Sequence, residues 1–496
     1  MEKSDEFDVI VVGGGPAGSA LSGLVTMRGA RVLLLEREVF PRYQIGESLL
    51  PSTVHGVCQL LGVGDELARA GFPIKRGGTF RWGARPEPWT FSFAVSPRVA
   101  SPTSFAYQVE RSKFDKIMLD NAARLGVDVR QGCTVQDLVD DGERVSGVRW
   151  VDRDGKEHLA TARFVVDASG NTSRLHTKTG GKREYSEYFR SLALFGYFEG
   201  GKRLPEPTSG NILSVAFDSG WFWYIPLSDK LTSVGAVVHR SMAEKVQGDR
   251  EAALNALIAE CPLISEYLAN AKRVTEGPYG ELRVRKDYSY HNTRFWRPGL
   301  ILIGDAACFV DPVFSSGVHL ATYSALLAAR SINSIMSGTV SEDAAMREFE
   351  TRYRREFGVF YEFLMSFYQM NRNEDSYFWE AKRVTNNEHS TEFESFVELV
   401  AGVSSGEAAL TDAAELVRRF ESRSHELEDA VNRITDDASG SASMLKSSVV
   451  KQAMQEGSQV QMRALLGKDA APEAPLFSGG LVPTADGLCW EPAPQA

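Results

Sequence analysis

A glycine-rich segment near the N-terminus has the residue types and spacing that bind the pyrophosphate of a dinucleotide. Residues 7–12 form a short apolar run, and a Gly-x-Gly-x-x-Gly pattern follows directly. The first glycine allows a tight turn, the second lets the backbone approach the pyrophosphate, and the third permits close helix–strand packing. The N-terminus of the following helix attracts the phosphates. The candidate contact residues are Gly13, Gly15, Pro16, Ala17 and Gly18.

An acidic residue completes this fingerprint. A helix expected over 19–28 leads into a second apolar strand, 31–35, which ends at Glu36. Its separation from the glycines is close to the roughly 20 residues expected for the acid that binds a ribose hydroxyl. Strand, glycines, helix, strand and acid occur in order, so the sequence predicts a dinucleotide-binding domain. Arg37, the next residue, is a further candidate for cofactor binding.

The amine of Lys75 would be available for covalent chemistry if its apolar neighbours buried it. The residue lies in GFPIKRGGTFRWG, residues 71–83, where Phe72 and Ile74 can form an apolar pocket. Desolvation in such a pocket lowers the pKa of a lysine from about 10.4, and the charge of Arg76 would act in the same direction. The amine would then be a nucleophile near neutral pH. Most lysines lie in solvent, so the residue type alone does not select Lys75.

Two later segments favour FAD over NAD as the dinucleotide. Residues 164–174, FVVDASGNTSR, and 300–312, LILIGDAACFVDP, each run from an apolar strand into a turn that contains aspartate. They resemble the Asp-Gly and Gly-Asp motifs of aromatic-hydroxylase-like flavoproteins. The resemblance implies that Asp305, next to Gly304, binds the ribityl chain and that Asp167 supports the nucleotide fold. A second glycine fingerprint is absent, so the sequence offers no obvious site for a nicotinamide donor.

Composition limits the class of protein and its partners. The chain has 496 residues, 43% of them hydrophobic, which suits a globular protein with a large core. Its formal net charge of −10 argues against nucleic acid as a partner. Five scattered cysteines without a Cys-x-x-Cys pattern indicate free thiols, and no metal site is predicted. Without an apolar segment of roughly 18 residues or a signal peptide, we expect a cytoplasmic protein with no membrane partner.

The expected fold class is α/β, with a discontinuous, doubly wound FAD-binding domain of the aromatic-hydroxylase-like type. An antiparallel sheet forms a substrate domain that includes a hairpin around residues 228–230, and a helical C-terminal region follows. That region has a helix over 343–371, an apolar stripe between Leu416 and Ile434, and a Pro-rich tail that is loosely ordered or lies over a surface. The predicted boundaries are 1–75, 105–185 and 275–335 for FAD binding, 76–104 and 186–274 for the sheet, and 336–496 for the C-terminal region.

Longer segments resemble the FAD-dependent halogenases. The branch that modifies phenols or pyrroles tethered to carrier proteins fits best, and within it the resemblance to the chondrochloren-type halogenase is close. The matching segments extend to about residue 400, and the last hundred residues resemble the family less clearly. They are FPRYQIGESLLPSTVHG at 40–56, GFPIKRGGTFRWG at 71–83, GWFWYIPLSD at 220–229 and IGDAACFVDPVFSSGVHLATYSALL at 303–327.

The resemblance implies a reaction and a set of roles. Reduced FAD arrives from a separate reductase and forms a hydroperoxide with dioxygen, and chloride attacks it to give hypochlorous acid. The acid reaches Lys75, whose amine forms a chloramine or donates a hydrogen bond that orients the oxidant. Trp221 and Trp223 lie beside the flavin and suppress hydroxylation, although packing in a core explains two aromatic residues equally well. The family pattern adds Arg111, Pro312 and Gly317 to the cofactor-binding residues.

The turn at 311–317 bears on halide and substrate. Backbone N–H groups of Ser316 and Gly317 at a helix start can bind an anion, which makes them the candidate halide site. Tryptophan halogenases carry a glutamate where this chain has Phe314. Its absence implies an electron-rich ring, such as a phenol, or another base elsewhere, and it argues against tryptophan as the substrate.

The resemblance also implies a protein partner, an acyl-loaded peptidyl carrier protein. Carrier proteins are commonly acidic, so a basic patch would favour docking. Arg352, Arg354 and Arg355 are one candidate patch, but their pattern favours an ordinary charged helix face. Two other functions use the same framework: a single-component flavin-dependent aromatic hydroxylase and a non-catalytic flavoprotein. Lys75 and the tryptophans favour the halogenase, while neither the preference between chloride and bromide nor the oligomeric state is predicted.

Overall fold

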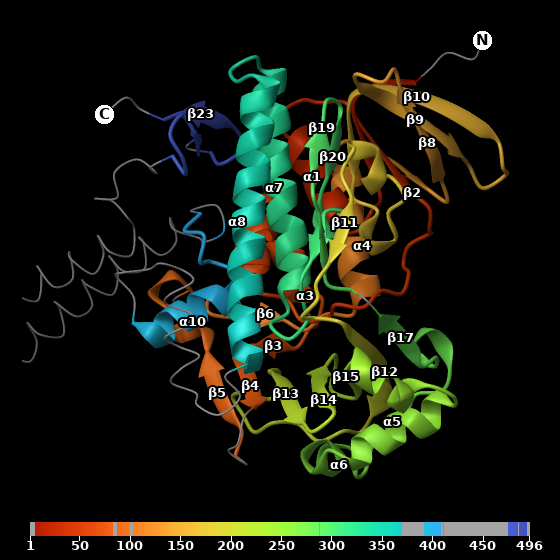
Figure 1. Ribbon diagram of the computed structural model, residues 1–496, viewed down its shortest axis with the longest axis vertical. Coiled ribbons are helices and arrows are strands. Elements are labelled where there is room, and N and C mark those ends of the chain that lie inside the picture. The colour runs from red at the N-terminus through yellow and green to blue at the C-terminus, as the bar shows by residue number, and fades with distance from the viewer. Residues whose placement is uncertain are drawn as a thin grey trace, which may run out of the picture.

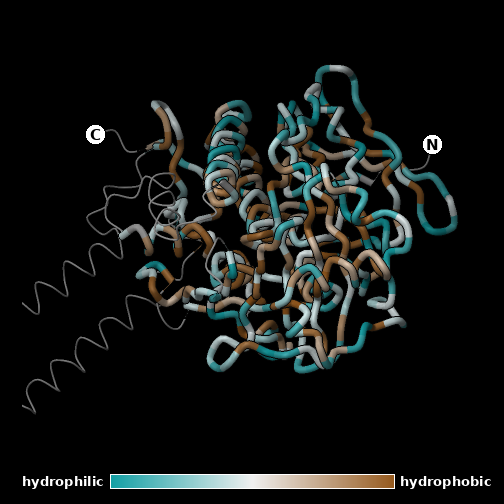
Figure 2. Tube along the Cα trace, turned by 60° about the horizontal axis from the view of Figure 1, so that its bottom comes forward, coloured by the Kyte–Doolittle hydropathy of each residue, from teal (hydrophilic) through white to brown (hydrophobic). Residues whose placement is uncertain are grey.

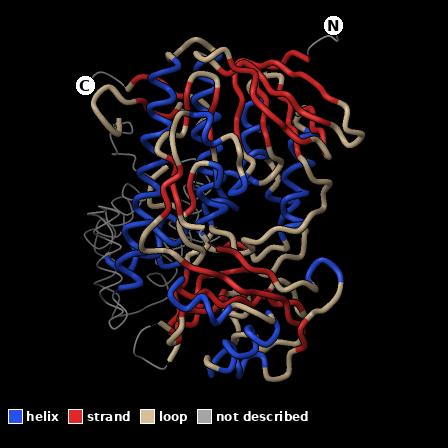
Figure 3. Tube along the Cα trace, turned by 45° about the vertical axis from the view of Figure 1, so that its right-hand side comes forward, coloured by secondary structure: helices blue, strands red, loops and turns tan. Residues whose placement is uncertain are grey.

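The computed structural model describes residues 5–82, 87–99, 103–286, 288–369, 391–407, 410, 475–484 and 486–493. Two large sheets lie at opposite ends of the long axis of the described structure, and two long helices run beside them (Figure 1). Strands gather in these two regions, with helices and loops between them (Figure 3). The mixed α/β architecture predicted from the sequence is confirmed. The stripe between Leu416 and Ile434 and much of the Pro-rich tail lie outside the described residues.

The first sheet carries the nucleotide-binding fingerprint. Its strands run in the order β19-β20-β10-β1-β2-β7, and all neighbouring pairs except β19–β20 are parallel. Residues 9–12 of β1 and 32–35 of β2 are continuously apolar because both faces of this sheet are covered there. The bounds are β1 (Asp5–Val12), β2 (Val32–Glu36), β7 (Asp128–Gln131), β10 (Glu157–Asp167), β19 (Trp296–Arg297) and β20 (Leu300–Leu302).

Different elements cover the two faces of the first sheet. Helices α1 (Pro16–Thr26), α4 (Arg111–Arg124) and α7 (Ser316–Met336) share a core with alternate residues of β1 and β2. The other residues of these strands pack against the hairpin of β8 (Thr134–Asp140) and β9 (Val145–Val151). Helix α8 (Glu342–Gln369), predicted over 343–371, runs alongside α7 (Figure 1).

The second sheet has strand order β16-β12-β15-β14-β13-β4-β5, with β17 paired to β12. The predicted hairpin around 228–230 joins β14 to β15. The strand bounds are β4 (Gly77–Arg81), β5 (Trp89–Ser92), β12 (Ser191–Glu199), β13 (Ile212–Phe217), β14 (Gly220–Pro226), β15 (Leu231–His239), β16 (Lys272–Arg273) and β17 (Arg283–Lys286). Helices α5 (Arg250–Ala259) and α6 (Pro262–Leu268) cover one face.

One predicted boundary needs correction. The range 275–335 was assigned to the FAD-binding segments, yet β17 lies within it and pairs antiparallel with β12 of the second sheet. Four residues are too few to show a periodicity, and their placement depends on a partner strand almost 90 residues earlier in the chain. The chain therefore returns to the first sheet only after β17.

Smaller elements complete the described fold. Strand β3 (Ile74–Lys75) pairs with β6 (Ala106–Tyr107), and β11 (Arg183–Tyr185), β18 (Tyr290–Asn292) and β21 (Cys308–Phe309) form a three-stranded sheet. The remaining α-helices are α2 (Cys58–Leu60), α3 (Gly64–Arg69) and α10 (Glu392–Ala401), with a π-helix η1 (Ser52–Val57). Short 3-10 turns are η2 (Phe93–Val95), η3 (Pro97–Val99), η4 (Gly170–Thr172), η5 (His176–Thr179), η6 (Arg240–Val246), η7 (Gly277–Tyr279) and η8 (Gly304–Ala306).

The described part of the tail forms a hairpin of β22 (Leu481–Pro483) and β23 (Trp490–Pro492), which packs on α7 and α8. The side chain of Trp490 lies between Arg330 and Arg352, with guanidinium-to-ring distances of 5.0 and 5.1 Å. This described part of the tail lies over a surface, one of the two arrangements predicted for the tail. Hydrophilic segments mark the outer loops and hydrophobic ones the interior strands (Figure 2). Within the described residues, no helix is long and apolar enough to cross a membrane.

Candidate active site

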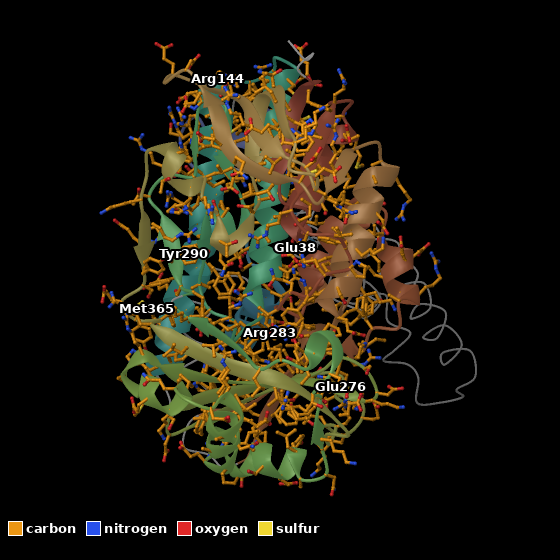
Figure 4. The ribbon with its side chains drawn as sticks, turned by 90° about the vertical axis from the view of Figure 1, so that its right-hand side faces the viewer. Glu38, Arg144, Glu276, Arg283, Tyr290 and Met365 are labelled. Carbon is orange, nitrogen blue, oxygen red and sulfur yellow. The ribbon has the colours of Figure 1, made fainter. Side chains whose placement is uncertain are left out.

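A cavity of about 570 Å³ lies where the carboxyl ends of the first sheet meet the second sheet. The loops after β1, β2, β10 and β20 line one side, as expected for a ligand site in an open parallel sheet. Residues of β12 and β14 line the other side. Figure 4 labels Glu38, which follows β2 and lines the cavity, and Arg283, which lies on β17 of the second sheet. The cavity therefore lies between the two sheets.

The glycine loop has the shape needed to hold a pyrophosphate. Gly13 has φ 107°, and a Cβ there would lie 2.6 Å from the carbonyl oxygen of Ala168. A Cβ on Gly18 would lie 1.9 Å from the oxygen of Gly13, so this glycine permits the close helix–strand packing. Gly15 caps α1 without any side-chain hydrogen bond to the helix. The first N–H groups of α1 are thus available to an anion, and Gly13, Gly15, Pro16 and Ala17 all line the cavity.

Glu36 connects the end of β2 to this loop. Its Oε2 accepts a hydrogen bond from the Gly14 N–H at 2.6 Å, and its Oε1 accepts one from the Glu38 N–H at 2.8 Å. Two carboxylate oxygens have about four lone-pair sites, so acceptor capacity remains for a ribose hydroxyl. Arg37 lines the same end of the cavity with a largely exposed side chain. This end fits the adenosine part of FAD.

The two predicted aspartates occupy different places. Asp305 lines the cavity beside Gly304, its carboxylate has no hydrogen-bond partner among the described residues, and burial raises its pKa to about 6. That carboxylate is free to bind a ribityl hydroxyl. Asp167 is fully buried behind the cavity wall, where its Oδ1 accepts from the Ser169 N–H at 3.0 Å. This hydrogen bond fits the supporting role predicted for Asp167.

Arg111 lines the cavity but is already engaged by the protein. Its Nε and Nη2 donate to the two oxygens of Asp115 at 2.7 and 2.9 Å. Its Nη1 donates to the carbonyl oxygens of Ile45 at 2.6 Å and Gly46 at 3.2 Å. A guanidinium has five N–H donors, so one remains for a cofactor. Its principal structural effect is to hold the 45–46 segment, a function that sequence reasoning missed.

Trp221 and Trp223 project from β14 into the cavity wall, because alternate residues of a strand face the same side. Their ring centroids are 6.2 Å apart, and the Trp223 Nε1 donates to the Ser233 hydroxyl at 3.1 Å. Gly235 lies directly opposite Trp223, where a Cβ would be 2.2 Å from the indole. Gly235 therefore makes room for this tryptophan, and the residue was not singled out from the sequence.

Lys75 lies just outside the cavity. Its Nζ is 3.0 Å from the carbonyl oxygen of Leu49 and 3.5 Å from the hydroxyl oxygen of Ser315, which lines the cavity. The side chain is 2% exposed, and burial lowers the pKa of its amine to about 7. A neutral amine has two N–H donors and one lone pair. The two oxygens therefore satisfy the neutral form and leave its lone pair free.

Helix α7 begins at the cavity with an unusual residue. Ser315 has φ 60°, the only positive φ of a non-glycine residue in the described chain, and its side chain does not cap the helix. Gly317 and Pro312 line the cavity, while Ser316 is fully buried. The first N–H groups of α7, including those of Ser316 and Gly317, have no partner within the helix. This arrangement fits the predicted halide site.

The turn before α7 places an aromatic ring at position 314 and a carboxylate at position 311. Phe314 is 3% exposed and packs against other rings. Asp311 is fully buried, and its Oδ1 accepts from the Val313 N–H at 3.0 Å and the Tyr368 hydroxyl at 3.1 Å. Burial raises the pKa of Asp311 to about 7. The sequence contained this carboxylate in the matching turn, but its burial depends on α8.

Two of the three arginines in the candidate basic patch on α8 are already paired within the protein. Arg352 is bound to Glu348 at 2.6 Å and to Glu407 at 2.9 Å, and its side chain is mostly buried. Arg354 is bound to Glu350 at 2.5 Å and donates to the carbonyl oxygen of Asn292 at 3.0 Å. These guanidinium groups hold the fold together, so they do not offer free charge to a partner.

Comparison with known proteins agrees with this geometry. The sequence model of the tryptophan halogenase family matches residues 8–100 and 95–434. The chain belongs to this family. It is a flavin-dependent halogenase. A tryptophan 2-halogenase from Chondromyces crocatus is 34% identical over 391 residues, covering 78% of this chain and 73% of that one. The flavin-dependent halogenase gsfI from Penicillium aethiopicum is 33% identical over 380 residues, covering 71% and 69%.

Solved structures of halogenases have the same fold. The myxobacterial chondrochloren halogenase CndH matches with a TM-score of 0.75 and 52% identity, covering 98% of this halogenase and 100% of that chain. The flavin-dependent halogenase CmlS matches with a TM-score of 0.68 and 31% identity, covering 87% and 79%. The predicted membership of the FAD-dependent halogenases and the close likeness to the chondrochloren type are confirmed.

Proposed function

We propose that this halogenase chlorinates an electron-rich phenolic ring, such as a tyrosine-like acyl group carried by a peptidyl carrier protein, in the biosynthesis of a natural product. Flavin-dependent halogenases generally rely on a separate flavin reductase, which here would supply reduced FAD. Reduced FAD, dioxygen and chloride together supply hypochlorous acid on the cavity side. The observation that carries the proposal is the buried amine of Lys75, held beside the cavity by Leu49 and Ser315.

Lys75 has the properties needed to retain a chlorine oxidant. At a pKa of about 7, a large fraction of its amine is neutral near physiological pH. The nitrogen lone pair attacks the chlorine of hypochlorous acid, an N–Cl bond forms, the Cl–O bond breaks, and one amine proton leaves with the hydroxide as water. Chlorine then passes to the ring carbon, and the ring proton returns to the amine nitrogen. Holding oxidant and ring together prevents random oxidation of other side chains.

Trp221 and Trp223 form the barrier in this proposal. Both are almost completely buried, and their indoles stand between the cavity and the second sheet. A barrier of this bulk keeps the ring away from the cofactor and leaves the small oxidant as the species that moves. The backbone N–H groups of Ser316 and Gly317, at the N-terminus of α7, would bind the chloride.

The phenolic substrate is inferred from Phe314. An aromatic cluster fills this position, so no carboxylate there can assist attack by the ring or remove its proton. A phenol is activated by its own oxygen and has less need of such a carboxylate. Tethering to a carrier protein is inferred from the resemblance of the matching segments, and the docking surface lies elsewhere than on Arg352 and Arg354.

One incubation tests the reaction and the partner together. The protein is mixed with FAD, a flavin reductase, NADH and chloride, and is offered free tyrosine analogues and their carrier-bound thioesters. Mass spectrometry then detects the mass and isotope pattern of added chlorine. Chlorine on the tethered phenol alone supports the whole proposal, and chlorine on the free amino acid removes the tether. Oxygen in place of chlorine would assign the protein to the aromatic hydroxylases.

A Lys75→Ala variant tests the proposed role of the amine. Its FAD binding and consumption of NADH should remain, because Lys75 lies outside the cavity lining. Chlorination should fall at least a hundredfold. Retention of normal chlorination by this variant would contradict the assignment of Lys75.

A further inference from the structure

Three buried polar side chains form a hydrogen-bonded row that the proposed chemistry does not use. The Ser52 hydroxyl oxygen is 2.9 Å from His319 Nδ1, and His319 Nε2 is 2.8 Å from Glu356 Oε1. All three are at most 3% exposed, and none lines the cavity. They come from η1, α7 and α8, so the row connects three separate elements.

The order serine, histidine, carboxylate is that of a hydrolytic triad, but access excludes this function. Ser52 lies beneath Gly402, the residue that ends α10. A Cβ on Gly402 would lie 2.3 Å from the Ser52 hydroxyl oxygen and 2.8 Å from His319 Nδ1. A site too close-packed for one methyl group has no room for a substrate carbonyl. The row therefore holds elements together.

Two of the elements it joins, η1 and α7, begin shortly after the two acceptors of Lys75 in the chain. Ser52 lies three residues after Leu49, whose carbonyl oxygen accepts from the amine. His319 lies four residues, about one helical turn, after Ser315, whose hydroxyl is the second contact. We propose that His319 is a positioning residue that fixes the Leu49 carbonyl relative to Ser315, and through them the Lys75 amine beside the cavity. This inference rests on the proposed role of Lys75.

Backbone strain explains why such a clamp is needed. A non-glycine residue in the left-handed region is strained and persists only where its surroundings determine it. Ser315 is in that region, directly before α7. His319 fixes the first turn of this helix to η1 through Ser52 and to α8 through Glu356. Without the imidazole, Leu49 and Ser315 would be free to move apart.

The hydrogen bonds limit how the imidazole can be oriented. A carboxylate only accepts, so Nε2 donates its proton to Glu356. Nδ1 then faces the Ser52 hydroxyl, which can both donate and accept. An asparagine at 319 can present an amide oxygen where Nδ1 was and keep the bond to Ser52. A leucine there cannot.

The test compares H319L and H319N with T322V as a matched control. Thr322 lies on the same buried stretch of α7, and its hydroxyl bonds only to the carbonyls of Val318 and His319. Each protein receives FAD, reductase, NADH and chloride, with substrate and monochlorodimedone, which traps free hypochlorous acid. The ratio of chlorinated substrate to chlorinated trap reports how well Lys75 retains the oxidant.

We expect H319L to lower this ratio at least tenfold with unchanged NADH consumption, while H319N and T322V stay within about twofold of the parent. Equal ratios in H319L and the parent would overturn the inference. K75M is run alongside: if it keeps the parent ratio, the proposed role of Lys75 fails instead.

A second measurement is independent of turnover. Acetylation of Lys75 by limiting acetic anhydride is followed by mass spectrometry of FAD-free protein over a range of pH. Loosening of the acceptors in H319L admits water to the amine, so the midpoint of its reactivity should move upward by at least half a pH unit, with no change in H319N. A midpoint in H319L identical to that of the parent would contradict a positioning role even if Lys75 proved non-catalytic.

Discussion

The amine of Lys75 donates to the carbonyl oxygen of Leu49, 3.0 Å away, inside a region with almost no solvent access. The acceptor is a neutral carbonyl, and no carboxylate of the described residues pairs with the amine to stabilise a positive charge. Burial is the cause of its lowered pKa. Burial beside a neutral acceptor affects reactivity, because the nitrogen lone pair is free only in the neutral amine. It also affects stability, because the unfolded chain binds a proton at Lys75 that the folded chain releases.

Chlorination should depend on pH through the Lys75 amine. If the neutral amine captures the oxidant, the rate of chlorination should fall about tenfold for each pH unit below about 7 and level off above it. The rate is measured under single turnover with hypochlorous acid supplied directly, so that the pH dependence of the reductase does not enter. A flat profile between about pH 5 and 8 would contradict capture by the neutral amine.

Lys75→Arg separates the two possible roles of the lysine. An arginine keeps N–H donors in this region but stays charged at all accessible pH values, so it cannot form a chloramine by the same route. We expect chlorination to fall at least a hundredfold, with FAD absorbance and thermal melting used to confirm that the variant is folded. If Lys75→Arg retains chlorination, hydrogen bonding to the oxidant is sufficient.

Lys75→Met should stabilise the protein most at and below pH 7. The folded pKa of about 7 lies below the unfolded value near 10.4, so the unfolded chain binds the extra proton between these values. The cost of Lys75 to folding is therefore largest at and below pH 7 and disappears as pH rises towards 10. The gain in unfolding free energy should be about 2 kcal/mol larger at pH 7 than at pH 9. Denaturant titration of both proteins at the two pH values measures it, and an equal gain would contradict the buried, neutral amine.

Local patterns in the sequence predicted the parts of the site that are local in the fold. The glycine loop, Glu36 and the aspartate turns follow strands that share one sheet edge, so their grouping in a single cavity could be derived. The burial of Lys75 could not, because its acceptors come from Leu49 and Ser315, more than 20 residues before it and 240 residues after it. Ile74 was expected to help form an apolar pocket around Lys75, but its side chain faces solvent.

Charged residues showed the same limit. Arg352 and Arg354 form a run of basic residues along the chain, but their partners come from Glu348, Glu350 and the distant Glu407. Helical spacing makes the first two pairs recognisable from the sequence, since they are separated by four residues. The third depends on a segment that reaches α8 only in the folded protein. A run of arginines therefore did not predict a free surface charge.

Gly235→Val should disturb the tryptophan barrier without touching the cofactor loops. A Cβ at 235 would lie 2.2 Å from the Trp223 indole, so the ring must move out of its place in the cavity wall. We expect tryptophan fluorescence to change, FAD affinity to change by several-fold, and some substrate to gain oxygen instead of chlorine. Ala236→Val, on the opposite face of the same strand, is the control for a general effect on β15. Product with chlorine alone, together with shifted fluorescence, would argue that Trp223 is not part of a barrier against hydroxylation.

Asp311→Asn should stabilise the protein more in mildly alkaline than in mildly acidic solution. The folded pKa of Asp311 is raised to about 7 by burial, whereas an unfolded aspartate titrates near 3.9. The folded chain therefore binds the extra proton, and the stability of the parent falls as pH rises from about 4 to 7 and is level above. Asparagine keeps an acceptor for the Val313 N–H and the Tyr368 hydroxyl but carries no charge. The unfolding free energy of the variant minus that of the parent should be larger at pH 8 than at pH 5, by on the order of 2–3 kcal/mol. Any change in packing affects the variant equally at the two pH values and therefore cancels. If the difference in unfolding free energy between variant and parent is the same at pH 5 and pH 8, Asp311 is ionised in the folded protein at both pH values.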